Sequence, residues 1–378
     1  MGRHPYFAPA EYEQRLARLK ARMRAAKVDA ALFDEIEAMI WITGFGSSAN
    51  RWRCAVIPME AEPFFLIRAL DAGICRDRSW ITDVPSYRDW EDPIPFLVAS
   101  LRERGLAEAR IGLDFESYGL SIGRFAAIRA ALPKAEFVDL GAVVAELRLI
   151  KSAAEIDLLR RAAAIADQAT IDAAAVCVVG GYQRDASKRA QMTFVEMGGD
   201  PYRPGPITAG RGWNFLHAPS GDEPLREGNV VHIELTPRIH GYSARIMRNV
   251  VLGPPEPERQ RAMDILVALQ DRQIAAMRPG AIAADIDAIL RQGVIEARLR
   301  DTYDNITGYT LGLYGDAGPR TSDFTRILHP EAHWAMEAGM VFHIYASAGG
   351  AAISESVLVT GEGSERLTRL PRGFIVNA

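Results

Sequence analysis

The chain has 378 residues, of which 48% are hydrophobic and 24% are charged, a composition typical of a globular enzyme with two or three domains. The net charge of −4 and the scattered basic residues give no electrostatic reason to expect nucleic acid or an anionic membrane as partner. The three cysteines are far apart, which argues against a disulfide framework or a zinc knuckle and favours a reducing cytoplasm. We predict no signal peptide and no membrane span, because the N-terminus lacks an apolar core and no run of about 18 apolar residues occurs.

The first part of the chain is predicted to be an α/β domain with a mixed sheet. An amphipathic helix is expected at 9–26, because Tyr12, Leu16, Leu19 and Met23 recur at helical spacing. The further elements are expected strands at 30–33, 39–43, 54–58, 63–67, 110–114 and 136–139, and expected helices at 94–104 and 119–131. This domain is predicted to end near residues 142–150.

The second part is predicted to begin with a long helix at 153–175. Ser152 precedes that helix, and Glu155 follows three residues later, which is a capping-box signal. From residue 182 the pattern predicts a helix, strands, a hairpin over 230–252, two helices within 257–298, and then strands to the C-terminus.

The predicted hairpin carries the most informative polar residues. His232 and Glu234 alternate with apolar neighbours, so a period of two places both side chains on one face of the strand. A turn around 237–241 returns the chain, and Arg245 then lies roughly across from Glu234. A cross-strand ion pair that stabilises the sheet modestly would explain these two charges without any function.

Several segments occur in the order and at the spacing of a known superfamily. They are the hairpin 230–252, 308–312, 339–345 and 353–360, together with 41–45 and 148–156 in the N-terminal half. They resemble the creatinase, prolidase and aminopeptidase P superfamily, whose catalytic domain has the "pita-bread" fold. The resemblance implies an α/β (α+β) protein with an N-terminal creatinase-like domain, residues 1–150, and a C-terminal pita-bread catalytic domain, residues 151–378.

Metallopeptidases of this superfamily bind two metal ions through two Asp, one His and two Glu. By resemblance, the matching positions here are Glu234, Arg245, Tyr309, Tyr345 and Ser354, of which only Glu234 is a plausible ligand. A fixed cation about 4 Å from a divalent ion would repel it by roughly 8 kcal/mol at an effective dielectric of 20. We therefore predict no bound metal ion and no other cofactor.

Two metal-free branches resemble the chain, namely creatinase and the ectoine hydrolase-like proteins. The second is more similar, because the pair Gly308–Tyr309 replaces the metal-ligand His motif. Creatinase carries a Glu where this chain has Met247, and residues 313–319 lack the Pro-Pro and Trp of the ectoine hydrolase pattern. The resemblance implies hydrolysis of a C–N bond at the carbon of a small amidine, guanidine or cyclic amidine.

We expect four residues to act in this reaction. Glu234 would attack the carbon or activate water, and His217, where the superfamily places a His near the scissile nitrogen, would carry a proton. Tyr309 would donate a hydrogen bond to a tetrahedral intermediate. Glu355 would bind a cationic nitrogen if a bulge turned it inward.

Further residues are candidates for substrate binding, although packing or a satisfied hydrogen bond would explain each of them equally well. They are Arg51, Trp213, His232, Tyr242, Arg245, Arg248, His343 and Tyr345. Arg245 either neutralises Glu234 or holds a substrate carboxylate. By resemblance, the loop 44–53 with Arg51 covers the active site of the second subunit of a homodimer.

Two alternatives remain at this point. The first is a metal-dependent Xaa-Pro peptidase. The second is a catalytically inactive pita-bread protein that binds a ligand or partner, since one fold can host different functions.

Overall fold

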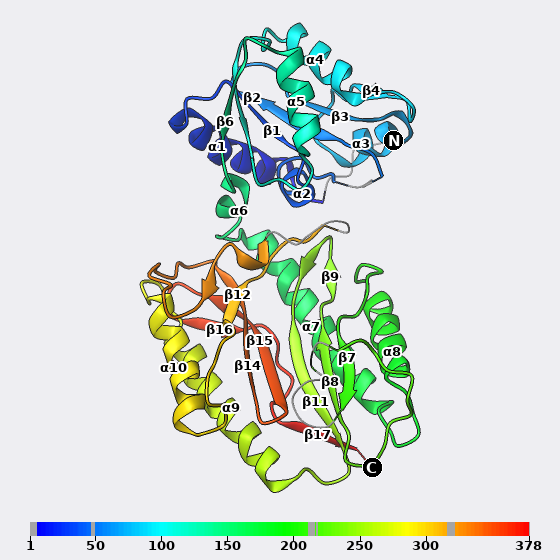
Figure 1. Ribbon diagram of the computed structural model, residues 1–378, viewed down its shortest axis with the longest axis vertical. Helices are drawn as coiled ribbons and strands as arrows, with labels where there is room; N and C mark the ends of the chain where they lie inside the picture. The colour runs from blue at the N-terminus through cyan, green and yellow to red at the C-terminus, as the bar shows by residue number, and fades with distance from the viewer. Residues whose placement is uncertain (1–5, 47–49, 211–215, 217, 316–321, 378) are drawn as a thin grey trace. The chain divides into compact units, whose positions relative to one another are not determined.

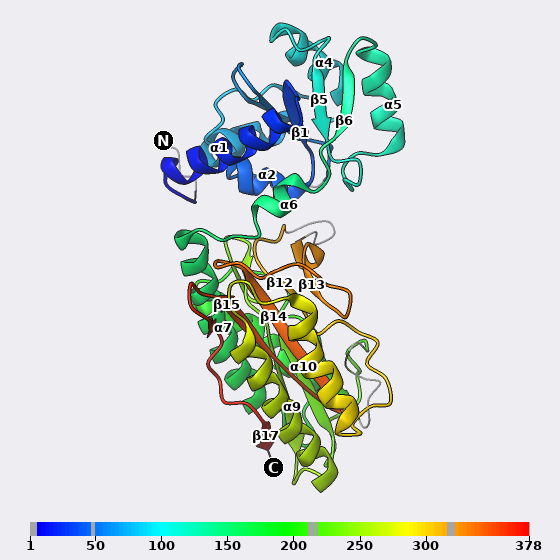
Figure 2. The same cartoon turned by 90° about the vertical axis from the view of Figure 1, so that its left-hand side faces the viewer.

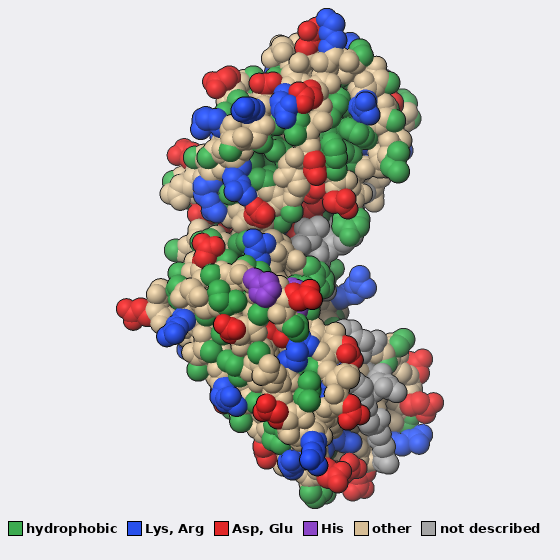
Figure 3. All heavy atoms as spheres, turned by 60° about the vertical axis from the view of Figure 1, so that its left-hand side comes forward, with side chains coloured by type: hydrophobic (Ala, Val, Ile, Leu, Met, Phe, Trp, Pro, Cys, Tyr) green, Lys and Arg blue, Asp and Glu red, His purple; other side chains and the backbone are tan. Residues whose placement is uncertain are grey.

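The computed structural model describes residues 6–46, 50–210, 216, 218–315 and 322–377, which form two compact units (Figure 1). The first unit is Met1–Arg148 with Gly315–Thr321, and the second unit is Leu149–Tyr314 with Ser322–Ala378. Acidic and basic side chains are interspersed over the face that Figure 3 displays. Within the described ranges, no helix is both long and apolar enough to span a membrane.

The first unit is built on a six-stranded mixed sheet with the strand order β4-β3-β2-β1-β5-β6. The pairs β1/β2 and β2/β3 are antiparallel, whereas β3/β4, β1/β5 and β5/β6 are parallel. Its elements are α1 (Pro9–Ala25), β1 (Ala30–Phe33), α2 (Ile36–Thr43), β2 (Cys54–Pro58), β3 (Phe64–Arg68), α3 (Ala69–Arg78), β4 (Ser86–Tyr87), α4 (Pro93–Glu103), β5 (Arg110–Leu113), α5 (Ile122–Ala131), β6 (Glu136–Asp139) and α6 (Val143–Leu147).

The prediction of a strand at 39–43 is wrong, because these residues belong to helix α2. The Glu35 side chain caps the helix by accepting hydrogen bonds from the backbone N–H groups of Glu37 and Ala38. Gly44 ends it in the left-handed region, at φ 85°. Nearly every residue of α2 is buried, so its apolar run has neither a helical nor a strand periodicity to distinguish the two structures.

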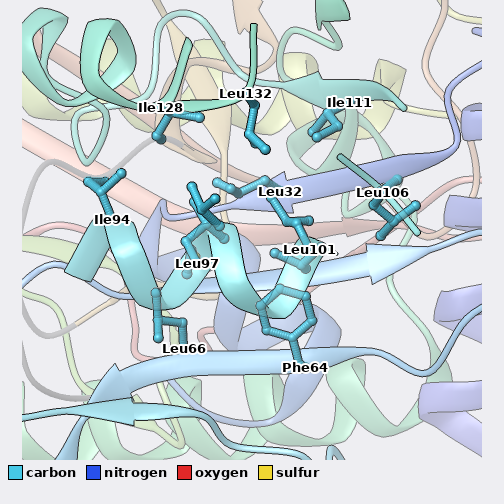
Figure 4. Close-up of a cluster of buried hydrophobic side chains, with 14 of the residues drawn as sticks. Leu32, Phe64, Leu66, Ile94, Leu97, Leu101, Leu106, Ile111, Ile128 and Leu132 are labelled. Atoms are coloured by element: carbon cyan, nitrogen blue, oxygen red, sulfur yellow. The ribbon is translucent and has the colours of Figure 1, made fainter. Parts of the chain in front are cut away.

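The core of the first unit lies between α4 and the sheet (Figure 4). Ile94, Leu97 and Leu101 recur at helical spacing, and they form one face of α4. This face packs against Leu32 of β1 and Leu66 of β3, and all five side chains are buried.

The second unit contains a nine-stranded sheet flanked by two pairs of helices (Figure 2). Seven strands follow the order β13-β12-β14-β15-β11-β8-β7, while β16 pairs with β15 and β17 pairs with β11. The elements are α7 (Ala153–Ala175), α8 (Gln183–Glu196), β7 (Ile207–Gly210), β8 (Val230–Leu235), β9 (Arg238–Ile239), β10 (Tyr242–Ser243), β11 (Ile246–Leu252), α9 (Pro257–Ala276), α10 (Ala283–Glu296), β12 (Gly308–Thr310), η1 (Ser322–Phe324), β13 (Ile327–Leu328), β14 (Val341–Ala348), β15 (Ala351–Val359), β16 (Ser364–Arg366) and β17 (Phe374–Asn377).

Helices α7 and α9 pack on the sheet of the second unit. Helix α7 contacts β8 and β11, and helix α9 contacts β14 and β15. The predicted capping box of α7 is confirmed, since Ser152 and Glu155 bond reciprocally to each other's backbone N–H. Gln270 of α9 donates to the backbone carbonyl of Ile344. Helix α9 therefore covers the face of the sheet on which the even-numbered side chains of β14 lie.

Strands β11 and β15 meet at a junction where side chains replace part of the backbone ladder. Their only backbone register pair among the described residues is Met247 with Ser354. The Asn249 side chain accepts from the backbone N–H of Ala352 at 2.6 Å. On the other side of that register pair, the Ser356 hydroxyl accepts from the backbone N–H of Arg245 at 2.8 Å. We call this junction the seam of the sheet.

Candidate active site

Strand register brings the predicted polar residues onto one face of the sheet in the second unit. Glu234 pairs with Met247, Met247 with Ser354, and Ser354 with Tyr345, so these four side chains form one row across β8, β11, β15 and β14. The neighbouring row contains His343, which pairs with Tyr309 of β12. We call this the polar face.

Glu234 is 5% exposed and lies between Arg245 and His232. Its Oε1 atom is 4.0 Å from a guanidinium nitrogen of Arg245, and its Oε2 atom is 3.8 Å from His232 Nε2. Burial alone would raise the pKa of Glu234, but the contact with His232 and the charge of Arg245 outweigh burial and lower the pKa to about 2. Glu234 is therefore a carboxylate throughout the physiological pH range.

Arg245 is held by Tyr309 of β12 and by Asp323 of η1. It donates to the Tyr309 hydroxyl, and its second terminal nitrogen is 3.1 Å from the Asp323 carboxylate. Its guanidinium carbon lies 5.2 Å from the ring centroid of Tyr309 and 5.6 Å from that of Tyr314. Burial would lower the pKa of Arg245, but Tyr309, Tyr314 and the nearby carboxylates raise it above its ordinary value. Arg245 is thus a permanent buried cation.

Asp323 is a site residue that the sequence did not reveal. It lies in η1, where a single acid between Ser322 and Phe324 has no periodicity or motif that would single it out. Its carboxylate is 2% exposed and reaches Arg245 from outside the sheet. Burial raises the pKa of Asp323 above its ordinary value, against the opposing charge of Arg245.

His343 is fully buried among aromatic rings. Its ring stacks on that of Tyr345 with centroids 5.4 Å apart, and it meets the Tyr309 ring edge-on at 5.0 Å. Burial and the charge of Arg245 lower the pKa of His343 to about 3. The imidazole is therefore neutral, and neither ring nitrogen has a hydrogen-bond partner among the described residues.

Several other buried polar atoms of this face also lack a hydrogen-bond partner within the part of the chain that the structure describes. They are Thr208 Oγ1, His232 Nε2, Glu234 Oε2 and Ser354 Oγ. Buried polar atoms are normally paired, so such a concentration is typical of a place where water or a ligand binds. The polar face therefore presents both hydrogen-bond donors and acceptors to a small polar molecule.

Glu355 and Arg248 lie on the opposite face of the sheet, because β15 has no bulge at Glu355 that would turn its side chain inward. The pairing of β14 with β15 is regular, with Ser354 opposite Tyr345 and Glu355 opposite Ile344. Glu355 accepts from Arg248 at 2.8 Å and from the Thr368 hydroxyl. Burial raises the pKa of Glu355 and lowers the pKa of Arg248, and their mutual attraction opposes both shifts. This buried ion pair is separated from Glu234 by the sheet.

The remaining predicted residues are Tyr242, Arg51, Trp213 and His217, of which Tyr242 contacts helix α7. The Tyr242 hydroxyl donates to Glu155 at 2.6 Å and so connects β10 to the first turn of α7. Arg51 is an exposed residue of the first unit. Trp213 and His217 lie outside the described residues.

The residues of the polar face do not fit a divalent metal ion. In the described ranges, no group of three or more His, Cys, Asp or Glu side chains is arranged to hold one. The cation of Arg245 lies 4.0 Å from Glu234, the one carboxylate of the row, and Tyr345 and Ser354 are the row's other polar side chains. This donor set supplies neither the charge nor the ligands that a two-metal centre needs.

Comparisons with known proteins agree with the predicted superfamily and fold. Residues 157–361 match metallopeptidase family M24, and residues 15–150 match the creatinase/prolidase N-terminal domain. The ectoine hydrolase of Halomonas elongata is 26% identical, over 98% of each chain. The Xaa-Pro dipeptidase of Pyrococcus furiosus is 27% identical, over 64% of this chain and 69% of its own. The prolidase structure from Thermococcus sibiricus matches with a TM-score of 0.84 and 22% identity, over 97% of this chain and 99% of its own. The prediction of a creatinase-like domain followed by a pita-bread domain is confirmed.

Proposed function

Since the chain belongs to metallopeptidase family M24, we propose that it is a hydrolase that cleaves a C–N bond in a small amidine, guanidine or cyclic amidine without a metal ion. One observation carries the proposal. A buried guanidinium, that of Arg245, lies 4.0 Å from Glu234 and is fixed by Tyr309 and Asp323 where the resemblance would place metal ligands. Activation of the substrate then depends on the protein's own acids, bases and hydrogen-bond donors.

In this proposal Glu234 is the catalytic carboxylate. The pKa of about 2 keeps it charged, and Oε2 has no hydrogen-bond partner among the described residues, so this oxygen is available to orient water or to contact the substrate carbon. In the water-activating version, the oxygen of water bonds to the amidine carbon. The electron pair of the broken C–N bond stays on the departing nitrogen, which takes a proton, and the products are an amide or urea and an amine.

Tyr309 is the proposed hydrogen-bond donor to the intermediate. A guanidinium has donors only, so in the contact between Arg245 and Tyr309 the phenol oxygen must be the acceptor. The proton of the Tyr309 hydroxyl is then free to point elsewhere. Burial raises the pKa of Tyr309 above its ordinary value, which keeps this proton in place at neutral pH. A donor fixed beside a cation favours negative charge on an adjacent substrate atom.

Proton transfer to the departing nitrogen is assigned to His217 on the sequence resemblance alone. On the polar face itself, His343 is neutral because its pKa is about 3. A neutral imidazole can donate a hydrogen bond from one nitrogen and accept at the other, which suits binding of a polar substrate.

A metal-dependent Xaa-Pro dipeptidase is the second candidate, favoured by the 27% identity to such an enzyme. Incubating the full chain with ectoine, creatine, acetamidine and an Xaa-Pro dipeptide, with EDTA and separately with Mn²⁺, distinguishes the two. We expect mass spectrometry to detect C–N cleavage of an amidine or guanidine with EDTA present. Cleavage of the dipeptide alone, and only with Mn²⁺, would reverse the order of the candidates.

The matched control for this assay is an acid of the same unit that is remote from the polar face. Glu331 is exposed, and its carboxylate forms no hydrogen bond or ion pair with the residues that the structure describes. Glu331→Gln should keep full activity, whereas Glu234→Gln should lose it. Equal activity of both variants would remove the proposed role of Glu234.

A further inference from the structure

We infer that Asn249 and His232 are positioning residues for Glu234, because Asn249 fixes the His232 imidazole in the form that points its N–H toward the carboxylate. This inference rests on the proposed function and deepens it by naming the groups that orient the proposed catalytic carboxylate. Asn249 pairs in register with His232 across β11 and β8, so the two side chains are neighbours on the polar face. Both side chains are buried.

The side-chain amide of Asn249 can face only one way. The backbone N–H of Ala352 lies 2.6 Å from Oδ1 of Asn249, and a backbone N–H group can only donate. If the amide were reversed, two N–H groups would face each other at this distance with no acceptor between them. The oxygen of Asn249 therefore points to β15, and its nitrogen points to His232.

This orientation decides which ring nitrogen of His232 carries the proton. The Asn249 Nδ2 atom is 3.4 Å from His232 Nδ1. An amide nitrogen only donates, so Nδ1 must present its lone pair, and the neutral ring then carries its proton on Nε2. Thr208 pairs in register with His232 on its other side, and its hydroxyl has no hydrogen-bond partner among the described residues. The Thr208 hydroxyl therefore does not compete with Asn249 for Nδ1.

The proton on Nε2 faces Glu234. Nε2 lies 3.8 Å from Oε2 of Glu234, and neither atom has a hydrogen-bond partner in the part of the chain that the structure describes. This distance exceeds a hydrogen bond, but the hydrogen bonds of catalytic groups are often long in the free protein and shorten when the substrate binds. Arg245 attracts the other oxygen, Oε1, from 4.0 Å. The carboxylate is thus oriented through both of its oxygens.

The effect on Glu234 is consistent with this arrangement. Burial raises the pKa of Glu234, whereas the contact with His232 and the charge of Arg245 lower it, to about 2. Asn249 also holds β11 to β15 through Ala352, so a loss of activity on replacing Asn249 would not separate positioning from a structural role. The test must therefore observe the ring of His232 directly.

Nitrogen-15 NMR of the histidine rings in the full chain, assigned through correlations from each ring to its own Cβ atom, shows which nitrogen is protonated. We expect His232 to carry its proton on Nε2 at neutral pH, and a proton on Nδ1 would overturn the inference. In Asn249→Asp a carboxylate oxygen replaces the amide nitrogen, so Nδ1 should become protonated as well. An unchanged His232 spectrum in that variant would overturn the role of Asn249. If the variant does not fold, the wild-type spectrum decides.

The contact with Glu234 is tested on the same signals. Glu234→Gln removes the charge that faces Nε2, so the N–H resonance of His232 should shift. The exposed control Glu331→Gln should leave that resonance in place. A resonance that also stays in place in Glu234→Gln would show that His232 does not position the carboxylate.

Two replacements of His232 separate positioning from packing. His232→Gln keeps an N–H group that can reach Glu234, whereas His232→Leu has no polar atom. We expect the leucine variant to turn over at least ~10-fold more slowly than the glutamine variant, with little change in KM, because a hydrogen bond to a charged group is lost. Equal turnover in two variants of equal Tm would overturn the inference, and if either does not fold, the Glu234→Gln spectrum decides. Hydrolysis is scored separately from the ring spectra, so a protein with the expected spectra that cleaves nothing refutes only the proposed reaction.

Discussion

Ser354 and Glu355 are neighbours in β15, and their side chains lie on opposite faces of the sheet. Ser354 belongs to the row that contains Glu234, whereas Glu355 pairs with Arg248 at 2.8 Å on the other face. A shift of one residue would exchange these two environments, because side chains alternate along a strand. The regular pairing of β14 with β15 therefore assigns Glu355 to stability and Ser354 to the polar face.

Replacement of Arg248 should destabilise the fold and leave the chemistry intact. Arg248→Met removes the nearest cation of the fully buried Glu355 and leaves only Arg372 and Arg366, at 3.9 Å and 4.0 Å, so the free energy of unfolding should fall by about 3 kcal/mol. Urea denaturation measures this loss. The control is Arg226→Met, which breaks an exposed ion pair with Glu223 and should cost about 1 kcal/mol or less. Equal losses in the two variants would contradict the buried-pair assignment.

Glu234→Gln should abolish turnover while the fold survives. Glutamine keeps the shape and hydrogen-bonding capacity of the side chain and removes the charge, so turnover should fall by at least ~10²-fold. Melting temperature and single-turnover rate are measured on the same samples. If Glu234 only pairs with Arg245, the variant would instead melt earlier and turn over at the wild-type rate.

His217→Ala should reduce turnover about as much as Glu234→Gln. Residues that act as one catalytic unit are not additive, so the double variant should be little slower than either single variant. Multiplicative losses in the double variant would show that the two residues act independently.

The purified protein should contain no stoichiometric transition metal, and EDTA should leave its activity unchanged. The reason is the buried Arg245 cation 4.0 Å from the one carboxylate of the Glu234 row. Elemental analysis after dialysis measures the content. One or more Mn, Co or Zn ions per chain in the site would refute this prediction.

The stability of the protein should depend on pH through His343. Its pKa is about 3 in the folded state against an ordinary value of 6.5, so the unfolded chain binds more protons between these two values. The free energy of unfolding should therefore fall as the pH drops below 6.5, by about 1.4 kcal/mol per pH unit from this group. Glu234 adds to the fall only below its ordinary pKa of 4.5.

His343→Phe replaces the imidazole with an apolar ring and should remove this contribution between pH 6.5 and 5. Denaturation curves of the wild type and the variant across that window provide the measurement. Parallel pH dependences would mean that folding does not lower the pKa of His343.

We also predict a homodimer, on the resemblance and on the arginine- and aromatic-bearing loop 44–53. Light scattering should report about twice the chain mass of 41.5 kDa. Arg51→Ala should then weaken substrate binding without dissociating the dimer, because Arg51 is exposed. A fully active monomer would exclude the proposed role of Arg51.

Local patterns predicted the parts of this protein that depend on neighbouring residues. The capping box at Ser152 and the alternation around Glu234 are set within a few positions, and both are confirmed. The contact between Glu234 and Arg245 also followed from the hairpin pattern, although Glu234 pairs in register with Met247 and Arg245 reaches it through a long side chain.

The parts that could not be predicted depend on distant segments or on patterns without periodicity. Asp323 contacts Arg245 across 78 positions of the chain, and nothing in its own surroundings indicates a counter-ion. Helix α2 was mistaken for a strand because its buried, apolar residues are compatible with both structures. The side of the sheet that Glu355 occupies depended on whether a bulge interrupts β15, and a bulge leaves no clear signal in one sequence.

The seam between β11 and β15 separates the half of the sheet with Glu234 from the half with Tyr309, His343 and Tyr345. Asn249 and Ser356 bridge the seam beside the register pair of Met247 and Ser354, so the spacing between the two halves depends in part on side chains that are replaceable one at a time. Natural variation or laboratory evolution could therefore adjust the width of the site through these two positions. Asn249 pairs in register with His232 and Ser356 with His343, so both positions lie on the polar face and a change at either would alter its spacing directly.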